Sequence, residues 1–109
     1  MTIDLEFKNY ILDQLGEIEP FDTKNMFGGT ALLRNGVAFA KIKHGSLWLK
    51  VDDSNINDFI EKGMPQYTYG KNNSRKLNFY ETPAEILEDS IILIQWANSA
   101  YQAAARSKT

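Results

Sequence analysis

Two adjacent glycines, Gly28 and Gly29, are the first residues in this chain whose type and spacing suggest chemistry. Phosphate-binding loops place glycines so that backbone amides converge at the N-terminus of a helix, as in G-x-G-x-x-G. Here the pair precedes the strand-like run 30–33, and no Lys-Ser or Lys-Thr pair follows directly. The pattern favours a β-bulge or a close backbone contact at the start of a strand. Docking of a partner at this point stays open as the second interpretation.

The single histidine, His44, lacks the companions that catalysis or metal binding requires. The nearest acidic residues in the sequence, Asp52 and Asp53, come after the next predicted strand, so no triad or ligand spacing exists. The chain has no cysteine, which excludes disulfides, thiolate catalysis and zinc sites built on sulfur. We predict that His44 is a solvated turn residue, and that the protein has no metal and no cofactor.

The carboxylates of the chain fall mostly at predicted helix caps and on exposed helix faces. A glycosidase-like pair needs two carboxyl groups held about 5 to 9 Å apart across a cleft, and no such cleft is visible in the sequence. We therefore predict no catalytic residues and a protein that is not an enzyme. An enzyme or small-ligand protein would require a pocket between helices and sheet.

Basic residues alternate with aromatic ones along the predicted strands. The basic residues are Lys41, Lys43, Lys50, Arg75 and Lys76, and the aromatic ones are Phe39, Trp48, Tyr69 and Tyr80. Such a pattern is typical of single-stranded nucleic-acid binding or of an acidic partner, with Lys41, Lys43, Arg75 and Lys76 as the nucleic-acid site. The alternative is a solvated sheet face whose lysines discourage edge-to-edge aggregation. The net charge of −2 favours this alternative, because duplex-DNA binders are usually basic.

The bulk composition describes an ordinary globular domain. A chain of 109 residues, 43% hydrophobic and 24% charged, fits one domain with a single core, spanning 1–109. The N-terminal stretch has no basic region followed by an apolar run, and no segment reaches the ~18 apolar residues of a membrane span. We expect a cytoplasmic protein.

Hydrophobic periodicity and turn residues predict the elements that position these side chains. We expect a helix over 4–18, three strands within 31–51 separated by Asn35-Gly36 and His44-Gly45, a helix from 52–54 to Gly63, strands at 67–70 and 75–81, and a helix from Pro83. The order α-β-β-β-α-β-β-α predicts a two-layer α+β domain with helices on one face of an antiparallel sheet.

The entry into the last helix carries the clearest local signal, Thr82-Pro83-Ala84-Glu85. It predicts a hydroxyl N-cap, proline at the first helical position and a glutamate that reaches back to the cap amide. Asp89 then interrupts the helix and caps a second segment. One face of that segment carries Leu93, Trp96, Ala97, Ala100 and Ala104.

Strict alternation on the strands assigns side chains to two faces. It places Ala38, Ala40 and Ile42 opposite Val37, Phe39, Lys41 and Lys43, and it places Leu47, Leu49 and Val51 opposite Trp48 and Lys50. Trp48 is then a core or an interface residue on the second face, where exposure would be costly unless something covers it. This motivates a homodimer hypothesis.

Several motifs together resemble the TfoX N-terminal domain of the TfoX/Sxy competence regulators. They are Met26-Phe27-Gly28-Gly29, Leu47-Trp48-Leu49-Lys50-Val51-Asp52, Tyr67-Thr68-Tyr69, and "NFYETPAEILED" followed by Trp96-Ala97, within residues 20–107. The resemblance implies a bacterial cytoplasmic domain, similar in architecture to secretion-chaperone-like proteins, with regulatory or protein-binding activity and no established catalytic residues. Competence regulators carry a second, C-terminal domain, so we expect a single-domain member. Fold similarity alone does not transmit a function.

We therefore expect a non-enzymatic regulatory or protein-interaction domain that acts through a protein partner, such as a transcription regulator. The expected partner-binding residues are Met26, Phe27, Gly28, Gly29, Trp48 and Lys50. The alternative is a nucleic-acid-binding accessory protein, which would show a salt-dependent affinity. A homodimer is a further possible partnership, and no membrane is involved.

Overall fold

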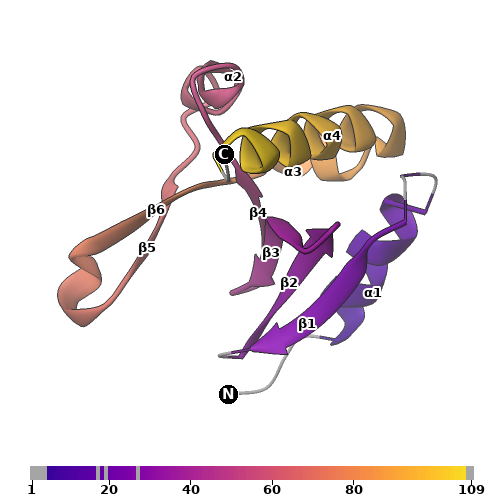
Figure 1. The fold of residues 1–109 in the computed structure, drawn as a ribbon, viewed down its shortest axis with the longest axis horizontal. Helices are drawn as coiled ribbons and strands as arrows, with labels where there is room; N and C mark the ends of the chain where they lie inside the picture. The colour runs from indigo at the N-terminus through magenta and orange to yellow at the C-terminus, as the bar shows by residue number, and fades with distance from the viewer. Residues whose placement is uncertain (1–4, 17, 19, 27, 108–109) are drawn as a thin grey trace.

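The computed structural model describes residues 5–16, 18, 20–26 and 28–107 of the chain. The elements are α1 (Leu5–Gln14), β1 (Asp22–Met26), β2 (Gly29–Arg34), β3 (Val37–Lys43), β4 (Ser46–Lys50), α2 (Ile56–Ile60), β5 (Gln66–Tyr69), the 3₁₀ helix η1 (Lys71–Asn73), β6 (Arg75–Glu81), α3 (Ala84–Leu87) and α4 (Ser90–Ser107) (Figure 1). The predicted α+β fold is confirmed.

The strands form one antiparallel sheet in the order β1-β2-β3-β4-β6-β5. Figure 1 shows α1 and α4 on the same side of this sheet, while the β5–β6 hairpin extends away from them. The sheet has six strands and not the five expected, because β1 was not predicted. That strand reads Asp-Thr-Lys-Asn-Met and pairs only with β2 at the sheet edge, so it lacks the apolar alternation by which strands are recognised.

The two predicted hairpin turns are confirmed by their backbone conformation. Asn35 and Gly36 have φ values of 54° and 77°, and His44 and Gly45 have values of 57° and 67°. Consecutive residues at positive φ make the turn type whose twist matches that of two antiparallel strands. The turns therefore fix β2 against β3 and β3 against β4.

The main core lies between the sheet and the helices. Four residues of the predicted α4 face, Leu93, Ala97, Ala100 and Ala104, are buried in it. The small alanine side chains let α4 approach the sheet closely. Trp96 is only partly buried, with its ring 4.8 Å from that of Phe59 of α2 in an edge-on arrangement.

A β-bulge in β3 corrects the predicted alternation. Leu33 pairs with Ala38 while Leu32 pairs with Ala40, so Phe39 is an extra residue. Both Phe39 and Ala40 therefore point into the main core, and each is fully buried. In β3, the odd-numbered residues up to Phe39 face the helices. From Lys41 onward the odd-numbered residues face the other side of the sheet, a switch that strict alternation does not predict.

The predicted cap at Thr82 is wrong. The residue at the N-cap of α3 is Pro83, with φ −59° and ψ 144°, and it makes no side-chain cap hydrogen bond. The Thr82 hydroxyl is buried without a hydrogen-bond partner among the described residues. The Thr82 amide instead donates to the Leu47 carbonyl oxygen at 2.8 Å, because β6 still pairs with β4 at this point.

The predicted interruption at Asp89 is confirmed. α3 ends at Leu87 and α4 begins at Ser90. The Asp89 Oδ1 atom accepts a hydrogen bond from the Ile92 amide at 3.2 Å, which satisfies one of the free amides of the first turn. Within the described residues, no helix combines the length and apolar character needed to cross a bilayer.

Candidate partner-binding face

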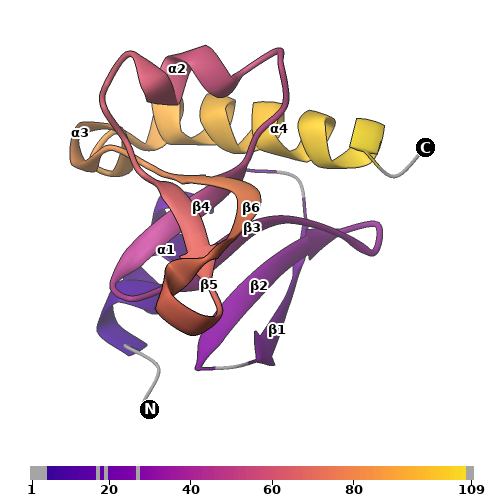
Figure 2. The ribbon, with the colours of Figure 1, turned by 90° about the vertical axis from the view of Figure 1, so that its left-hand side faces the viewer.

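The side of the sheet opposite the helices gathers basic and aromatic side chains. We call it the lysine–aromatic face and define it by Lys41, Lys43, Trp48, Lys50, Tyr67 and Phe79. Lys41 of β3 pairs with Trp48 of β4, and Lys50 pairs with Phe79 of β6, so these side chains share one face. Figure 2 shows the β5–β6 hairpin in front of β3 and β4. Tyr67 of β5 lies on the same face, because it packs on Trp48.

Trp48 is covered by its own chain. It forms a small second core with Tyr67, Phe79 and the partly buried Leu77, and only 9% of its surface is exposed. The Trp48 and Tyr67 rings meet edge to face at 5.1 Å and 90°. Of the two predicted roles for Trp48, the core role is the one that the structure supports. The homodimer hypothesis thus loses the observation that motivated it and stays an untested prediction.

Two of the three lysines of this face, Lys41 and Lys50, stand over its rings. Lys41 Nζ lies 5.7 Å from the centre of the Tyr67 ring and 5.4 Å from that of Phe79, and Lys50 Nζ lies 5.3 Å from that of Phe79. Each distance is within the range of a cation–π interaction. The aromatic cluster therefore holds two of the ammonium groups in place without neutralising them.

None of the three lysines of this face forms an ion pair among the described residues. Burial, followed by the charges of Lys43 and Lys50, lowers the pKa of Lys41 from its usual value. Both ion pairs found among the described residues, Lys62–Glu85 and Arg106–Asp52, involve other cations. A chain with a net charge of −2 thus carries an unneutralised group of three lysines on one face.

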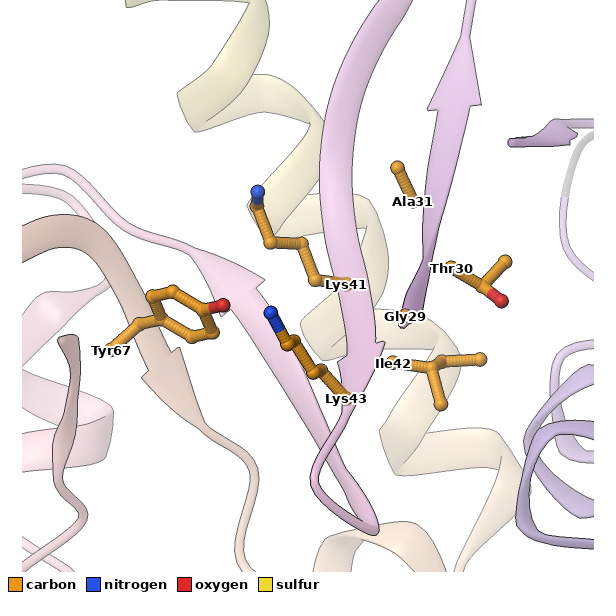
Figure 3. Close-up of a pocket in the computed structure, with 7 residues that line it drawn as sticks. All are labelled: Gly29, Thr30, Ala31, Lys41, Ile42, Lys43 and Tyr67. Atoms are coloured by element: carbon orange, nitrogen blue, oxygen red, sulfur yellow. The ribbon is translucent and has the colours of Figure 1, made fainter. Parts of the chain in front are cut away.

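A small pocket opens on this face between β2, β3 and β5. Figure 3 shows the Lys43 ammonium group and the Tyr67 hydroxyl pointing toward each other, with the Lys41 side chain leaving the same side of β3. Thr30 and Ile42 point to the other side of the sheet. Gly29 and Ala31 line it as well. The pocket has a volume of about 40 Å³.

The second glycine of the pair, Gly29, lines the same pocket. Gly28 has φ 76°, a conformation that favours glycine. A Cβ atom on Gly29 would lie 2.8 Å from the Ile42 carbonyl oxygen and 3.1 Å from the Lys43 Cβ. The structure thus supports the predicted close backbone contact at a strand start, and it also shows that the absence of a side chain makes room for Lys43.

The other predicted partner-binding residues have different outcomes. Met26 pairs with Gly29 at the end of β1, and Phe27 lies outside the described residues. Arg75 and Lys76 begin β6, beside η1 at the tip of the hairpin, and neither lines the pocket. The structure therefore groups Lys41 and Lys43 with Lys50, and not with Arg75 and Lys76 as the nucleic-acid site required.

Sequence reasoning did not select Tyr67 and Phe79 as site residues. Both are 6% exposed and pack on Trp48. Phe79 reaches the site because it pairs with Lys50, and Tyr67 does so because it follows Gln66, which pairs with Tyr80. Both placements depend on strand pairing between segments that are distant in sequence. The sequence did contain one indication. A large apolar side chain, Trp48, was expected on the second face with nothing assigned to cover it, and aromatic residues of the same chain, Tyr67 and Phe79, cover it.

The remaining titratable groups form no further centre in the described part of the chain. His44 is an exposed turn residue, as predicted. Across these residues there is no group of three or more His, Cys, Asp or Glu side chains that could hold a metal ion. Asp52 lies in the turn before α2, where its Oδ1 atom accepts a hydrogen bond from the Ser54 amide at 2.9 Å.

A comparison with protein-family models gives a match to the TfoX N-terminal domain over residues 13–104. The chain belongs to the TfoX N-terminal domain family. The match covers every strand of the sheet and nearly all of α4, so the resemblance inferred from the motifs is confirmed. No curated protein matches the chain. In this TfoX N-terminal domain, two residues of the recognised motifs belong to the lysine–aromatic face or its pocket: Trp48 and Gly29.

Proposed function

We propose that this TfoX N-terminal domain is a non-enzymatic, cytoplasmic protein-interaction module whose lysine–aromatic face binds an acidic segment of a partner protein. The observation that carries the proposal is the group of Lys41, Lys43 and Lys50, none of which has a carboxylate partner among the described residues. Two of them, Lys41 and Lys50, are held over aromatic rings. Complementary charge on a partner would steer association and fix its orientation.

The burial of the aromatic rings favours a protein over nucleic acid as the partner. Proteins that bind single strands stack successive bases on exposed aromatic side chains. Trp48, Tyr67 and Phe79 are each less than 10% exposed, so their faces are already used inside the domain.

The expected partner is a component of transcription regulation. This expectation depends on family membership, because the family is named after a competence regulator, and no feature of the face itself identifies the partner. The identity of the bound protein is therefore the measurement that tests this part of the proposal.

The experiment is affinity capture from the native cell with two baits, followed by mass spectrometry and cross-linking. One bait is the wild-type chain and the other carries Lys41→Met, Lys43→Met and Lys50→Met. We expect a protein enriched on the wild-type bait, cross-linked through a segment rich in Asp and Glu, and lost on the variant. Recovery of the bait alone in both cases would contradict the proposal and favour a homo-oligomer.

A parallel measurement addresses the nucleic-acid alternative. Fluorescence anisotropy with labelled single-stranded oligonucleotides should show no binding at low salt. A salt-dependent affinity that disappears in the triple variant would instead establish the alternative function.

A further inference from the structure

We propose that the pocket lined by Gly29, Lys41, Lys43 and Tyr67 binds a single oxyanion group, a carboxylate or a phosphate. This inference deepens the proposed function and rests on it, since the oxyanion would belong to the acidic segment of the partner. It assigns a specific point of contact to a face that would otherwise attract anions only by its overall charge.

Three polar groups that suit an oxyanion meet at this pocket. Lys41 and Lys43 are two positions apart on β3, so both side chains leave the same side of the strand. Tyr67 comes from β5, and Figure 3 shows its hydroxyl directed toward the two lysine side chains. Two ammonium groups and a phenolic hydroxyl provide several donors for carboxylate or phosphate oxygens.

The nearest carboxylate by strand register does not occupy this site. Glu81 pairs with Trp48 and so lies on the same face of the sheet. Its Oε2 atom accepts a hydrogen bond from the Ser46 hydroxyl at 2.6 Å. No ion pair between Glu81 and either pocket lysine exists, so the two cations remain available to an external anion.

The pocket is small enough to hold one anionic group. Gly29 and Ala31 supply a floor without long side chains, and Lys43 lies directly across Gly29. A volume of about 40 Å³ accommodates one small group. Burial and like charges already lower the pKa of Lys41, so a bound anion would offset an existing repulsion.

The experiment titrates the ¹⁵N-labelled full chain with inorganic phosphate, and separately with acetate, while sodium chloride keeps the ionic strength constant. We expect saturable NMR shifts confined to residues 29–31, 41–43 and 67. Lys43→Met should weaken binding about tenfold, as for loss of one charge-assisted hydrogen bond, and Tyr67→Phe about threefold. The control Lys71→Met, an exposed lysine of η1, should bind as the wild type does.

The outcomes separate this inference from the proposed function. Saturation by phosphate alone or by acetate alone supports the site and states which oxyanion it prefers. Shifts that do not saturate, or that are equal at all lysines, overturn the pocket even if partner capture succeeds. Saturable binding combined with failed capture would instead leave the pocket standing and remove the proposed protein-binding function.

Discussion

The indole Nε1 of Trp48 donates a hydrogen bond to the backbone carbonyl oxygen of Lys43 at 3.1 Å. This bond joins the second aromatic core to the strand that presents the lysines. Trp48→Phe should lower the free energy of unfolding by about 1–3 kcal/mol, because it removes a buried donor and leaves the carbonyl group without it. Urea unfolding followed by circular dichroism measures the change. The matched control Trp96→Phe should cost less, and equal losses would contradict this role of Trp48.

The close approach at Gly29 makes a second prediction. Gly29→Ala should destabilise the fold by about 1–3 kcal/mol, because the new Cβ atom would overlap the Ile42 carbonyl oxygen and push against Lys43. Anion binding should fall at the same time. The control Gly45→Ala meets no atom within 4 Å and carries only the cost of positive φ, about 1–2 kcal/mol, so anion binding should persist. A Gly29→Ala protein as stable as the wild type would disprove the contact.

The unpartnered hydroxyl of Thr82 distinguishes the structure from the sequence-based prediction. Thr82→Val should leave the free energy of unfolding unchanged or raise it, because an isosteric apolar group replaces a buried polar atom without a partner among the described residues. If Thr82 were instead a helix N-cap, the same change would cost about 1 kcal/mol. Chemical denaturation of the two proteins decides, and Thr82→Ser, which keeps the hydroxyl and loses the methyl group, should be the less stable variant.

The environment of Lys41 predicts a pH dependence. Burial and the neighbouring lysines lower the pKa of Lys41 in the folded state, whereas the unfolded chain keeps the ordinary value of about 10.4. Between these two values the unfolded state binds more protons, so this contribution to stability rises with pH. Lys41→Met should therefore be more stable than the wild type at neutral pH, by less than about 1 kcal/mol after solvent screening.

That advantage of Lys41→Met should shrink as the pH approaches 10.4 and the lysine of the wild type loses its proton. Added salt should also reduce it, because salt screens the repulsion from Lys43 and Lys50. Unfolding free energies of both proteins across this pH range provide the measurement. An advantage that grows with pH would show that the sign of the pKa change is wrong.

The ion pair between Asp52 Oδ2 and Arg106 Nε, 2.8 Å apart, connects the entry of α2 to the end of α4. The hydrogen bond from Arg106, with a second from Ser54, holds the pKa of Asp52 well below its usual range. A depressed carboxyl pKa contributes stability above the ordinary value of about 3.9, and the contribution is lost as the pH falls below it. Asp52→Asn should therefore lower the thermal midpoint slightly at pH 7, and by progressively less as the pH falls below about 3.9. Asp53→Asn is the control.

Local patterns predicted those features that depend on neighbours in sequence. The turns at Asn35-Gly36 and His44-Gly45, the interruption at Asp89 and the buried face of α4 follow from backbone conformation and helical spacing. The bulge at Phe39 and the coverage of Trp48 by Tyr67 depend on pairing between distant segments. The predicted N-cap at Thr82 was wrong because the pattern Thr-Pro-x-Glu also occurs where a strand continues to pair up to the start of the helix.

The difference between local patterns and pairing of distant segments also explains which residues of the candidate site were predicted. Lys41, Lys43 and Trp48 were recognisable from the alternation of basic and aromatic residues on adjacent strands. Tyr67 was not, because its position depends on the pairing of β5 with β6 and of β6 with β4. Arg75 and Lys76 matched the pattern by type alone, while the tip of the hairpin holds them beyond the pocket.

The extra residue in β3 bears on how the chain is aligned with other members of its family. A relative that lacks the equivalent of Phe39 could pair this strand regularly and still keep every remaining side chain on its present side. A one-residue gap at Phe39 would thus leave Lys41 and Lys43 on the same face of the sheet. An ungapped alignment of such a relative would exchange inward and outward positions, and it would hide whether that relative carries the same pair of cations.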